Sequence, residues 1–423
     1  MAKKNTKPKS PKRKKNKGES AQSFLPIRDI RNGVVETTDG RYLKILEVEP
    51  INFALRSSEE QFNIISSFAS WLKISPIRLQ FKAITRRADS DKHISLVQEE
   101  LAREENPQCR ALGQDYLRLI RDVGNREALT RRFFLIFQYE ALGRDDGDYR
   151  RICAALQGAE QTARAYFLQC GNGIVQPENP DEATAEILYQ IFNRRSCQTE
   201  PFQTRVDRVV LDTMAAQGLT LGLDPVPEIP VVDFLAPRGI DFTQSRYTIM
   251  DGRYYTVLMI RGNGYPSRVR AGWISTLINA GEGIDVDLFL RRENRGKAID
   301  KVAQRIRLNR TKLKGMQDTS TDYEELQNSI QAGYFIKNGI ANYNEDLFYL
   351  SVFLTISAQT LEELQWRKRQ MIDLLKSMDI FVSECKVQQE AALRSVMPFL
   401  QIDPALEKKS RRNVLTSGAA STY

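Results

Sequence analysis

The chain has 423 residues, of which 41% are hydrophobic and 27% charged, and its formal net charge is +9. This composition is that of a globular protein, and the length exceeds the roughly 250–300 residues at which one hydrophobic core stops growing, so two domains are expected. The longest apolar run, residues 347–357, is shorter than the roughly 18 residues of a membrane span. An integral membrane protein is therefore not expected.

The cysteines and histidine exclude several kinds of site. The five cysteines occur singly, without CxxC spacing, at Cys109, Cys153, Cys170, Cys197 and Cys385. Their odd number and scattered positions predict reduced thiols in a cytoplasmic protein. Since His93 is the one histidine, neither a histidine-rich metal site nor a Ser-His-Asp or Cys-His catalytic site is expected. No cofactor is predicted.

The net charge is concentrated at the N-terminus. Residues 1–18 contain nine Lys or Arg and no acid, and the rest of the chain has 53 basic and 53 acidic residues. Because the segment has almost no apolar residues to bury, we predict that residues 1–22 form a disordered basic tail. We expect Lys12, Arg13, Lys14 and Lys15 to contact either anionic lipid or nucleic-acid phosphate. The alternative is a solubilising segment without a dedicated partner.

The first folded elements follow an Asp-Gly pair. Asp39-Gly40 begins the tetrapeptide DGRY between β-branched runs, which favours a type I′ hairpin with positive φ at both residues. A strand is expected from Tyr42 to Val48. The pattern then predicts, in order, a helix opened by Ser58-Glu59-Glu60-Gln61 and ending before Pro76, a half-buried strand at 77–84, a polar helix at 94–104 and a buried strand at 133–137.

The same tetrapeptide recurs 212 residues later at Asp251-Gly252, and the order of predicted elements recurs with it. The pattern predicts a strand at 254–260, a helix at 269–279, an alternating strand at 284–289, a basic helix at 297–314, an apolar strand at 347–356 and a helix opened by Thr360-Leu361-Glu362-Glu363.

We therefore predict an α+β fold with two related mixed α/β halves, at 23–225 and 226–405. Each half has a DG hairpin followed by helix, strand, helix, strand and helix. In this interpretation Asp39, Gly40, Asp251 and Gly252 are structural turns without chemistry of their own. The alternative is coincidence, because strand-helix-strand order is common in mixed proteins.

Two other candidate sites are weak. Residues 262–268 contain two glycines between a strand and a helix, but they lack the GxxxxGK[ST] sequence that cradles phosphates, so a turn is predicted. Asp285 and Asp287 share one face of a strand and, with Glu282, have the carboxylates of a divalent-metal site. We favour the simpler interpretation, in which they form the solvated face of an amphipathic strand.

The helix at 297–314 is the strongest folded candidate for partner binding. It has seven basic residues and one acid, and Lys297, Lys301 and Arg305 are stacked at i, i+4 and i+8. This stripe is suited to a phosphate backbone or an acidic protein, but the simpler interpretation, which we favour, is a plain solvated face. The apolar residues Ile299, Val302 and Ile306 are expected to lie on its buried side.

Five further strings stand out: FLPIRDIRNG at 24–33, the first DGRY with ILEVEPINF at 45–53, APRGIDF at 236–242 before the second DGRY, INAGEGIDV at 278–286 and RIRLNR at 305–310. Together they resemble the TraC-like family of conjugative type IV secretion ATPases, from about residue 23 to the C-terminus. The resemblance implies an N-terminal α/β region that docks on the inner-membrane secretion channel.

The resemblance also implies a RecA-like ATPase core after this region, and residues 411–423 resemble the segment just before that core. We interpret 406–423 as a linker toward a missing motor and expect a truncated chain. The nucleotide-binding Lys and Thr of the family, and its Mg-coordinating acid, have no matching positions here, so no ATP hydrolysis is expected.

The sequence thus predicts a non-catalytic docking or assembly subunit of a conjugative type IV secretion system. We expect it at the cytoplasmic face of the inner membrane, in contact with channel proteins and capable of self-association. The alternative is a DNA-handling accessory factor of the same apparatus that uses the basic tail and the 297–314 helix. An enzyme with an unrecognised site is a third, weaker alternative, because no catalytic constellation is visible.

Overall fold

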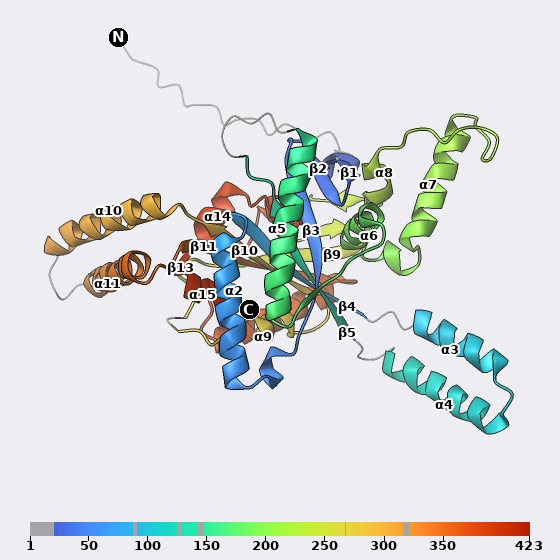
Figure 1. Ribbon diagram of the computed structural model, residues 1–423, viewed down its shortest axis with the longest axis horizontal. Helices are drawn as coiled ribbons and strands as arrows, with labels where there is room; N and C mark the ends of the chain where they lie inside the picture. Colours follow the sequence, from blue (N-terminus) through green and yellow to red (C-terminus); the bar gives the residue numbers. More distant parts are fainter. Residues whose placement is uncertain (1–20, 88–90, 125–128, 142–147, 267, 316–320) are drawn as a thin grey trace, which may run out of the picture.

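Figure 1 shows the computed structural model of the chain, which describes residues 21–87, 91–124, 129–141, 148–266, 268–315 and 321–423. The first described element is the short helix α1 (Ala21–Phe24). The predicted tail contacts at Lys12, Arg13, Lys14 and Lys15 therefore lie outside the described residues.

The strands of the described residues form one sheet of 13 strands. Its main path runs in the order β1-β2-β3-β5-β4-β10-β11-β9-β8-β7, and β6, β12 and β13 pair with β3, β9 and β11. The strands are β1 (Ile27–Arg31), β2 (Val34–Thr37), β3 (Tyr42–Glu49), β4 (Arg78–Arg87), β5 (Leu129–Gln138), β6 (Gly173–Ile174), β7 (Ile240–Asp241), β8 (Thr248–Met250), β9 (Arg253–Ile260), β10 (Ile284–Arg292), β11 (Leu347–Ala358), β12 (Val382–Glu384) and β13 (Arg412–Leu415).

Helices cover both faces of this sheet. Besides α1, they are α2 (Ser58–Ile74), α3 (Asp91–Arg103), α4 (Pro107–Gly124), α5 (Tyr149–Gln169), α6 (Pro180–Phe192), α7 (Phe202–Ala216), α8 (Val231–Leu235), α9 (Ile274–Ile278), α10 (Arg295–Lys314), α11 (Thr321–Asn342), α12 (Leu361–Ser377), α13 (Gln389–Val396), α14 (Pro404–Ser410) and α15 (Thr416–Ala420), with 3₁₀ turns η1 (Phe53–Leu55) and η2 (Ser196–Gln198). The mixed α+β class is confirmed.

The two predicted halves share the sheet. β4 and β10 pair antiparallel at its centre, with Ala83 opposite Val286 and Leu79 opposite Leu290. From this pair outward, one side reads β4-β5-β3-β2 and the other reads β10-β11-β9-β8. Equivalent elements of the two predicted halves therefore occupy equivalent places. A common origin of the halves, and a boundary between residues 225 and 226, stay predictions.

Each face of the sheet has its own hydrophobic core, and each core combines residues from before and after the predicted boundary. On one face, α2, α5, α9, α12 and α15 bury side chains such as Phe68 and Leu350. On the other face, α6, α8, α13 and α14 bury side chains such as Phe134 and Phe353. Residues 412–420, inside the predicted linker, form β13 and α15, and β13 pairs with β11.

Because both faces are covered, the strand prediction for 77–84 needs correction. An alternating pattern indicates that one face of the strand is exposed to solvent. In the structure Gln80 and Lys82 are only 0% and 3% exposed, and Leu79 and Ala83 on the other face are also buried. The polar side chains of β4 face other buried polar groups instead of water. The strand prediction for 284–289 needs the same correction.

Local signals predicted the helix starts well, with small shifts. Thr360 caps α12 by accepting a hydrogen bond from the Glu363 amide, as predicted. α2 begins with a capping box between Ser57 and Glu60, one residue earlier than the predicted Ser58. The helix predicted at 269–279 is limited to α9, since Gly272 has a φ of +70°.

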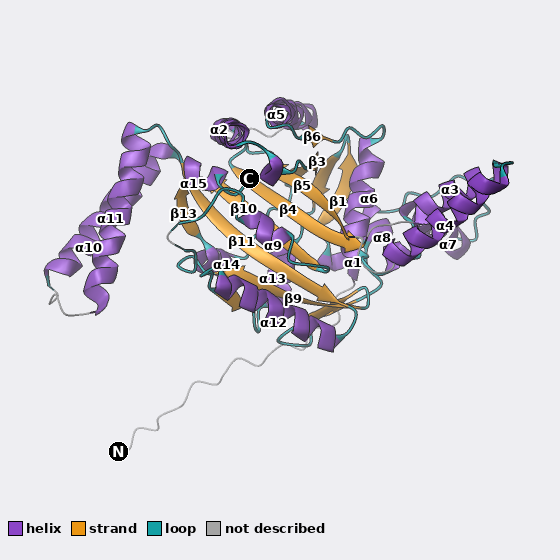
Figure 2. Cartoon of the chain, turned by 90° about the horizontal axis from the view of Figure 1, so that it is seen from below, coloured by secondary structure: helices purple, strands orange, loops and turns teal. Residues whose placement is uncertain are grey.

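Two helical hairpins project from the sheet. The α3–α4 arm (residues 91–124) connects the neighbouring strands β4 and β5, and the α10–α11 arm (residues 295–342) connects the neighbouring strands β10 and β11. Figures 1 and 2 show the two arms extending from opposite sides of the body. Neither α4 nor α11 is among the elements predicted from the sequence.

Candidate functional site

The α10–α11 arm brings together the folded residues that the sequence singled out. Its two helices pack through a small cluster of Val302, Ile306 and Ile330. At the base of the arm, Ala298 and Ile340 pack with residues of β11 and β13. The predicted buried side of α10 is confirmed for Val302 and Ile306, and Ile299 is half-buried against the base. The arm thus has its own core, separate from those of the sheet.

α10 presents strong positive charge to solvent. Arg295–Lys314 contains eight basic residues and one acid, and all eight basic side chains are exposed. At 100° per residue, Lys297, Lys301 and Arg305 lie along one side of the buried stripe, while Arg307 and Arg310 lie along the other. The predicted stripe therefore exists, and a second basic stripe flanks the same core.

The three predicted contact residues differ in their surroundings. Lys301 Nζ lies 2.6 Å from Glu293 Oε2, which also accepts a hydrogen bond from the Tyr349 hydroxyl at 2.9 Å. This hydrogen bond from Lys301 to Glu293 raises the pKa of Lys301. Within the described residues, Lys297 and Arg305 make no ion pair. Of the three predicted contact residues, Lys297 and Arg305 are therefore the more available to a partner.

Exposed apolar side chains accompany this charge. Leu308 of α10 is 56% exposed, Tyr334 and Phe335 of α11 are 45% and 70% exposed, and Tyr343, directly after α11, is 69% exposed. Arg310 also donates a hydrogen bond to the Tyr334 hydroxyl at 3.2 Å. Arginine beside exposed aromatic rings is a common composition for protein interfaces. Sequence reasoning missed this part, because α11 was not predicted.

The α3–α4 arm has a different surface. Leu112, Tyr116 and Leu119 of α4 are 72%, 45% and 59% exposed, and their i, i+4, i+7 spacing places them on one side of the helix. Near the tip, Glu99, Glu100 and Glu105 are exposed. Exposed Arg103 and Arg110 lie near the same tip, so this arm has charges of both signs beside its apolar side, whereas α10 is basic. The spacing of the three apolar residues was a readable helix signal in the sequence.

The repeated DG pairs form two different turns. Asp251 and Gly252 both have positive φ, +51° and +70°, as a type I′ hairpin between β8 and β9 requires. In the first turn only Gly40 has positive φ, at +78°, and Thr37 pairs with Arg41. The type I′ prediction is therefore wrong for Asp39-Gly40, because a longer loop connects β2 and β3.

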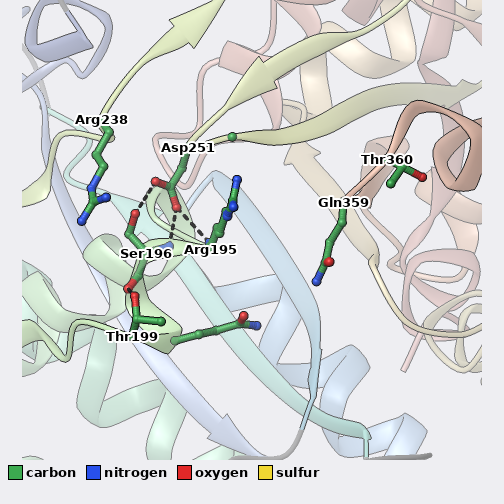
Figure 3. A pocket seen from close by; sticks show the side chains of 9 residues that line it. Arg195, Ser196, Thr199, Arg238, Asp251, Gln359 and Thr360 are labelled. Carbon is green, nitrogen blue, oxygen red and sulfur yellow. Dashed lines mark hydrogen bonds between the residues drawn. The ribbon is translucent and has the colours of Figure 1, made fainter.

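The side chains of the two aspartates also differ. Asp39 pairs with Arg41 at 2.9 Å near the surface. Asp251 is buried and caps η2, accepting hydrogen bonds from the Arg195 amide at 2.8 Å and from the amide and hydroxyl of Ser196 at 2.7 and 2.5 Å (Figure 3). The second turn thus fixes the position of η2 against the sheet.

Asp285 and Asp287 do not form a solvated face. Both are buried, at 2% and 0% exposure, and each has a cationic partner from a distant part of the chain. Lys82 Nζ lies 2.8 Å from Asp287 Oδ2, and Arg194 pairs with Asp285. Burial raises the pKa of Asp287 despite the attraction of Lys82. Glu282 pairs with Arg367 at 3.0 Å instead of joining the two aspartates.

Among the described residues, no group of three or more His, Cys, Asp or Glu side chains is arranged to hold a metal ion. No described helix is both long enough and apolar enough to span a membrane. The 262–266 part of the predicted turn packs against backbone, and the Gly262 amide donates to the carbonyl of Lys409 at 2.9 Å.

Comparison with known protein families identifies a match in the first part of the chain. The model of a family described as an archaeal TraC-like domain matches residues 28–143. This interval runs from β1 through β5 and includes the α3–α4 arm. No curated protein matches the chain. The TraC-like resemblance is confirmed for this segment and suggests a link to conjugation or secretion machinery.

Proposed function

We propose that this chain is a non-catalytic docking and assembly component of a conjugative type IV secretion system, which contacts the inner-membrane channel from its cytoplasmic side. The TraC-like match at residues 28–143 supports the link to this kind of machinery. The α10–α11 arm, which lies after this interval, supports a role in protein contacts.

The observation that carries the proposal is the shape and charge of this arm. It extends from the body between two neighbouring strands, so that its outer surface is free of the sheet (Figure 2). The arm has exposed Lys297 and Arg305 on α10 and exposed Phe335 on α11. A charged and aromatic surface of this kind is suited to an acidic face of a partner protein.

The test is flotation of the purified chain with inverted membrane vesicles. One vesicle preparation contains the channel proteins of the conjugation system encoded with this chain, and the other is made from cells lacking them. We expect the chain to float with the first preparation only. The double variant Lys297→Glu with Arg305→Glu should lose this binding, because both side chains are exposed and have no ion pair within the described structure.

A matched control changes the same amount of charge elsewhere. Arg369 and Lys376 are exposed on α12, which packs on the body of the protein. The variant Arg369→Glu with Lys376→Glu should float like the unmodified chain. Equal binding by vesicles with and without channel proteins would contradict the proposal, as would equal loss in the two double variants.

A second candidate function is favoured by the eight basic residues of α10. As a DNA-handling factor, the chain would bind mixed-sequence duplex with an affinity that falls steeply with salt. Each lost phosphate contact lowers the slope of log affinity against log salt by about 1, so Lys297→Glu with Arg305→Glu should lower it by about 2. Removing residues 1–18 measures the contribution of the tail separately. A chain that floats with channel vesicles but does not bind DNA would exclude this second candidate.

A further inference from the structure

A cavity of about 760 Å³ lies beside the second DG hairpin, where η2 approaches the end of β11 and the start of α12 (Figure 3). It is lined by Arg195, Ser196, Gln198, Thr199, Arg238, Asp251, Gly252, Gln359 and Thr360. Every one of these residues except Gly252 has a polar side chain. This volume falls within the roughly 300–1,000 Å³ of typical ligand sites.

Two arginines form the cationic wall of the cavity. Arg195 is exposed and makes no ion pair among the described residues. A β-carbon added to Gly252 would meet its guanidinium at 2.8 Å, so glycine is needed for Arg195 to lie across the turn. The Arg238 side chain is 62% exposed. Its ion pair with Glu200, at 3.4 Å, is a weak one, because Glu200 also forms an ion pair with Arg208 at 2.9 Å.

A third arginine is close to the lining residues in the chain. Arg253 follows Gly252, and the β9–β11 register, which places Tyr254 opposite Ala358, brings the backbone of Arg253 next to that of Gln359. Arg253 is not itself a lining residue. Arg253 is only 6% exposed, yet its Nε has no hydrogen-bond partner within the described structure. Burial lowers its pKa.

A buried guanidinium N–H without a bonding partner is costly, and such groups in folded proteins usually have an explanation such as a bound ion. Glu282 favours the charge of Arg253 electrostatically, but it also forms an ion pair with Arg367. The one carboxylate among the lining residues, Asp251, already accepts three hydrogen bonds from Arg195 and Ser196. The cavity therefore has an excess of positive charge.

We propose that this cavity is a binding site for a phosphate-bearing small molecule. Arginine forks match phosphate oxygens in a bidentate manner, so Arg195 and Arg238 would hold the phosphate, and the neighbouring Arg253 would add positive charge. The hydroxyls of Thr199 and Thr360 would supply further hydrogen bonds. The volume leaves room for the organic group to which the phosphate is attached.

The test is thermal unfolding and calorimetric titration of the full chain with two probes, inorganic phosphate and adenosine monophosphate. We expect saturable binding that raises the melting temperature, and tighter binding of the probe that fills more of the cavity. Arg195→Ala with Arg238→Ala should weaken binding by about tenfold or more, because two charge-assisted contacts are lost. The matched control is Arg369→Ala with Lys376→Ala on α12, two exposed residues outside the cavity lining, and this variant should bind like the unmodified chain.

Arg253→Met gives an independent readout. It removes a buried charge whose Nε has no partner in the described structure, so the free protein should melt at a higher temperature while the response to phosphate is lost. Absence of saturable binding by either probe would overturn the proposal. Equal binding by the unmodified chain and by the Arg195→Ala, Arg238→Ala variant would also overturn it, since the bound anion would then lie elsewhere.

Discussion

Lys82 of β4 and Asp287 of β10 form a buried ion pair at the centre of the sheet, with Nζ 2.8 Å from Oδ2 and side chains 3% and 0% exposed. Lys82 also donates to the Val396 carbonyl at 3.0 Å, and Gln80 donates to Asp287 Oδ1 at 2.8 Å. The pair joins two strands that are about 200 residues apart in sequence, at the junction of the two predicted halves.

Lys82→Met should destabilise the protein strongly. It leaves the Asp287 carboxylate buried without its cation, which typically costs about 3–5 kcal/mol of unfolding free energy. Adding Asp287→Leu to this variant should recover most of the loss, because the uncompensated charge is then gone. Chemical denaturation of the two single variants and the double variant measures the coupling. Additive losses would show that the two side chains do not depend on each other.

The two DG turns should respond differently to the same substitution. Asp251→Ala removes the acceptor of three hydrogen bonds to η2, so we expect a loss of about 2–3 kcal/mol. Asp39→Ala removes a surface ion pair with Arg41 and a hydrogen bond from the Thr37 hydroxyl, both near solvent, and should cost about 1 kcal/mol. Denaturant unfolding of both variants checks this. Similar losses would mean that the repeated tetrapeptide has one role in both places.

The outer part of the α10–α11 arm should be dispensable for folding. Asn309 Nδ2 of α10 donates a hydrogen bond to Ser329 Oγ of α11 at 2.9 Å, so these two residues lie opposite each other along the arm. Replacing residues 310–328 by a short Gly-Ser connection should change the unfolding free energy by about 1 kcal/mol or less, because the cores of the sheet are untouched. Hydrogen exchange should show faster exchange in α10 and α11 than in β10 and β11. Cooperative loss of the whole fold on truncation would contradict this.

Stability should fall in alkaline solution. Burial, together with the nearby Glu200, raises the pKa of Tyr189 from 10 to about 12, and its hydroxyl donates to the Glu200 carbonyl at 2.9 Å. Because the folded state holds this proton more tightly than the unfolded state, the contribution is complete below pH 10 and is lost between pH 10 and 12.

Tyr189→Phe isolates this contribution. The variant should be less stable than the unmodified chain at pH 9, and the difference should shrink by at most about 3 kcal/mol as the pH approaches 12. Urea unfolding at pH 9, 10 and 11 measures it. A difference that is constant over this range would show that the hydroxyl of Tyr189 does not titrate with folding.

The sequence by itself determined the local features of this protein. The cap at Thr360, the hairpin at Asp251-Gly252 and the buried stripe of Val302 and Ile306 depend on residues within a few positions of one another, so spacing alone predicts them. The basic character of α10 is likewise a property of the chain.

Only the tertiary structure decided which surfaces are exposed. The alternation of Asp285 and Asp287 is typical of the solvent-exposed face of a strand. In the fold, pairing of β10 with β4 brings Lys82 against Asp287, and Arg194, just after α6, pairs with Asp285. The cavity lined by Arg195 and Arg238 likewise depends on η2, the β8–β9 turn and the end of β11 meeting. Such contacts join residues far apart in the chain. The free energy that stabilises them comes from burial of apolar area across the whole sheet, and a local sequence pattern does not specify it.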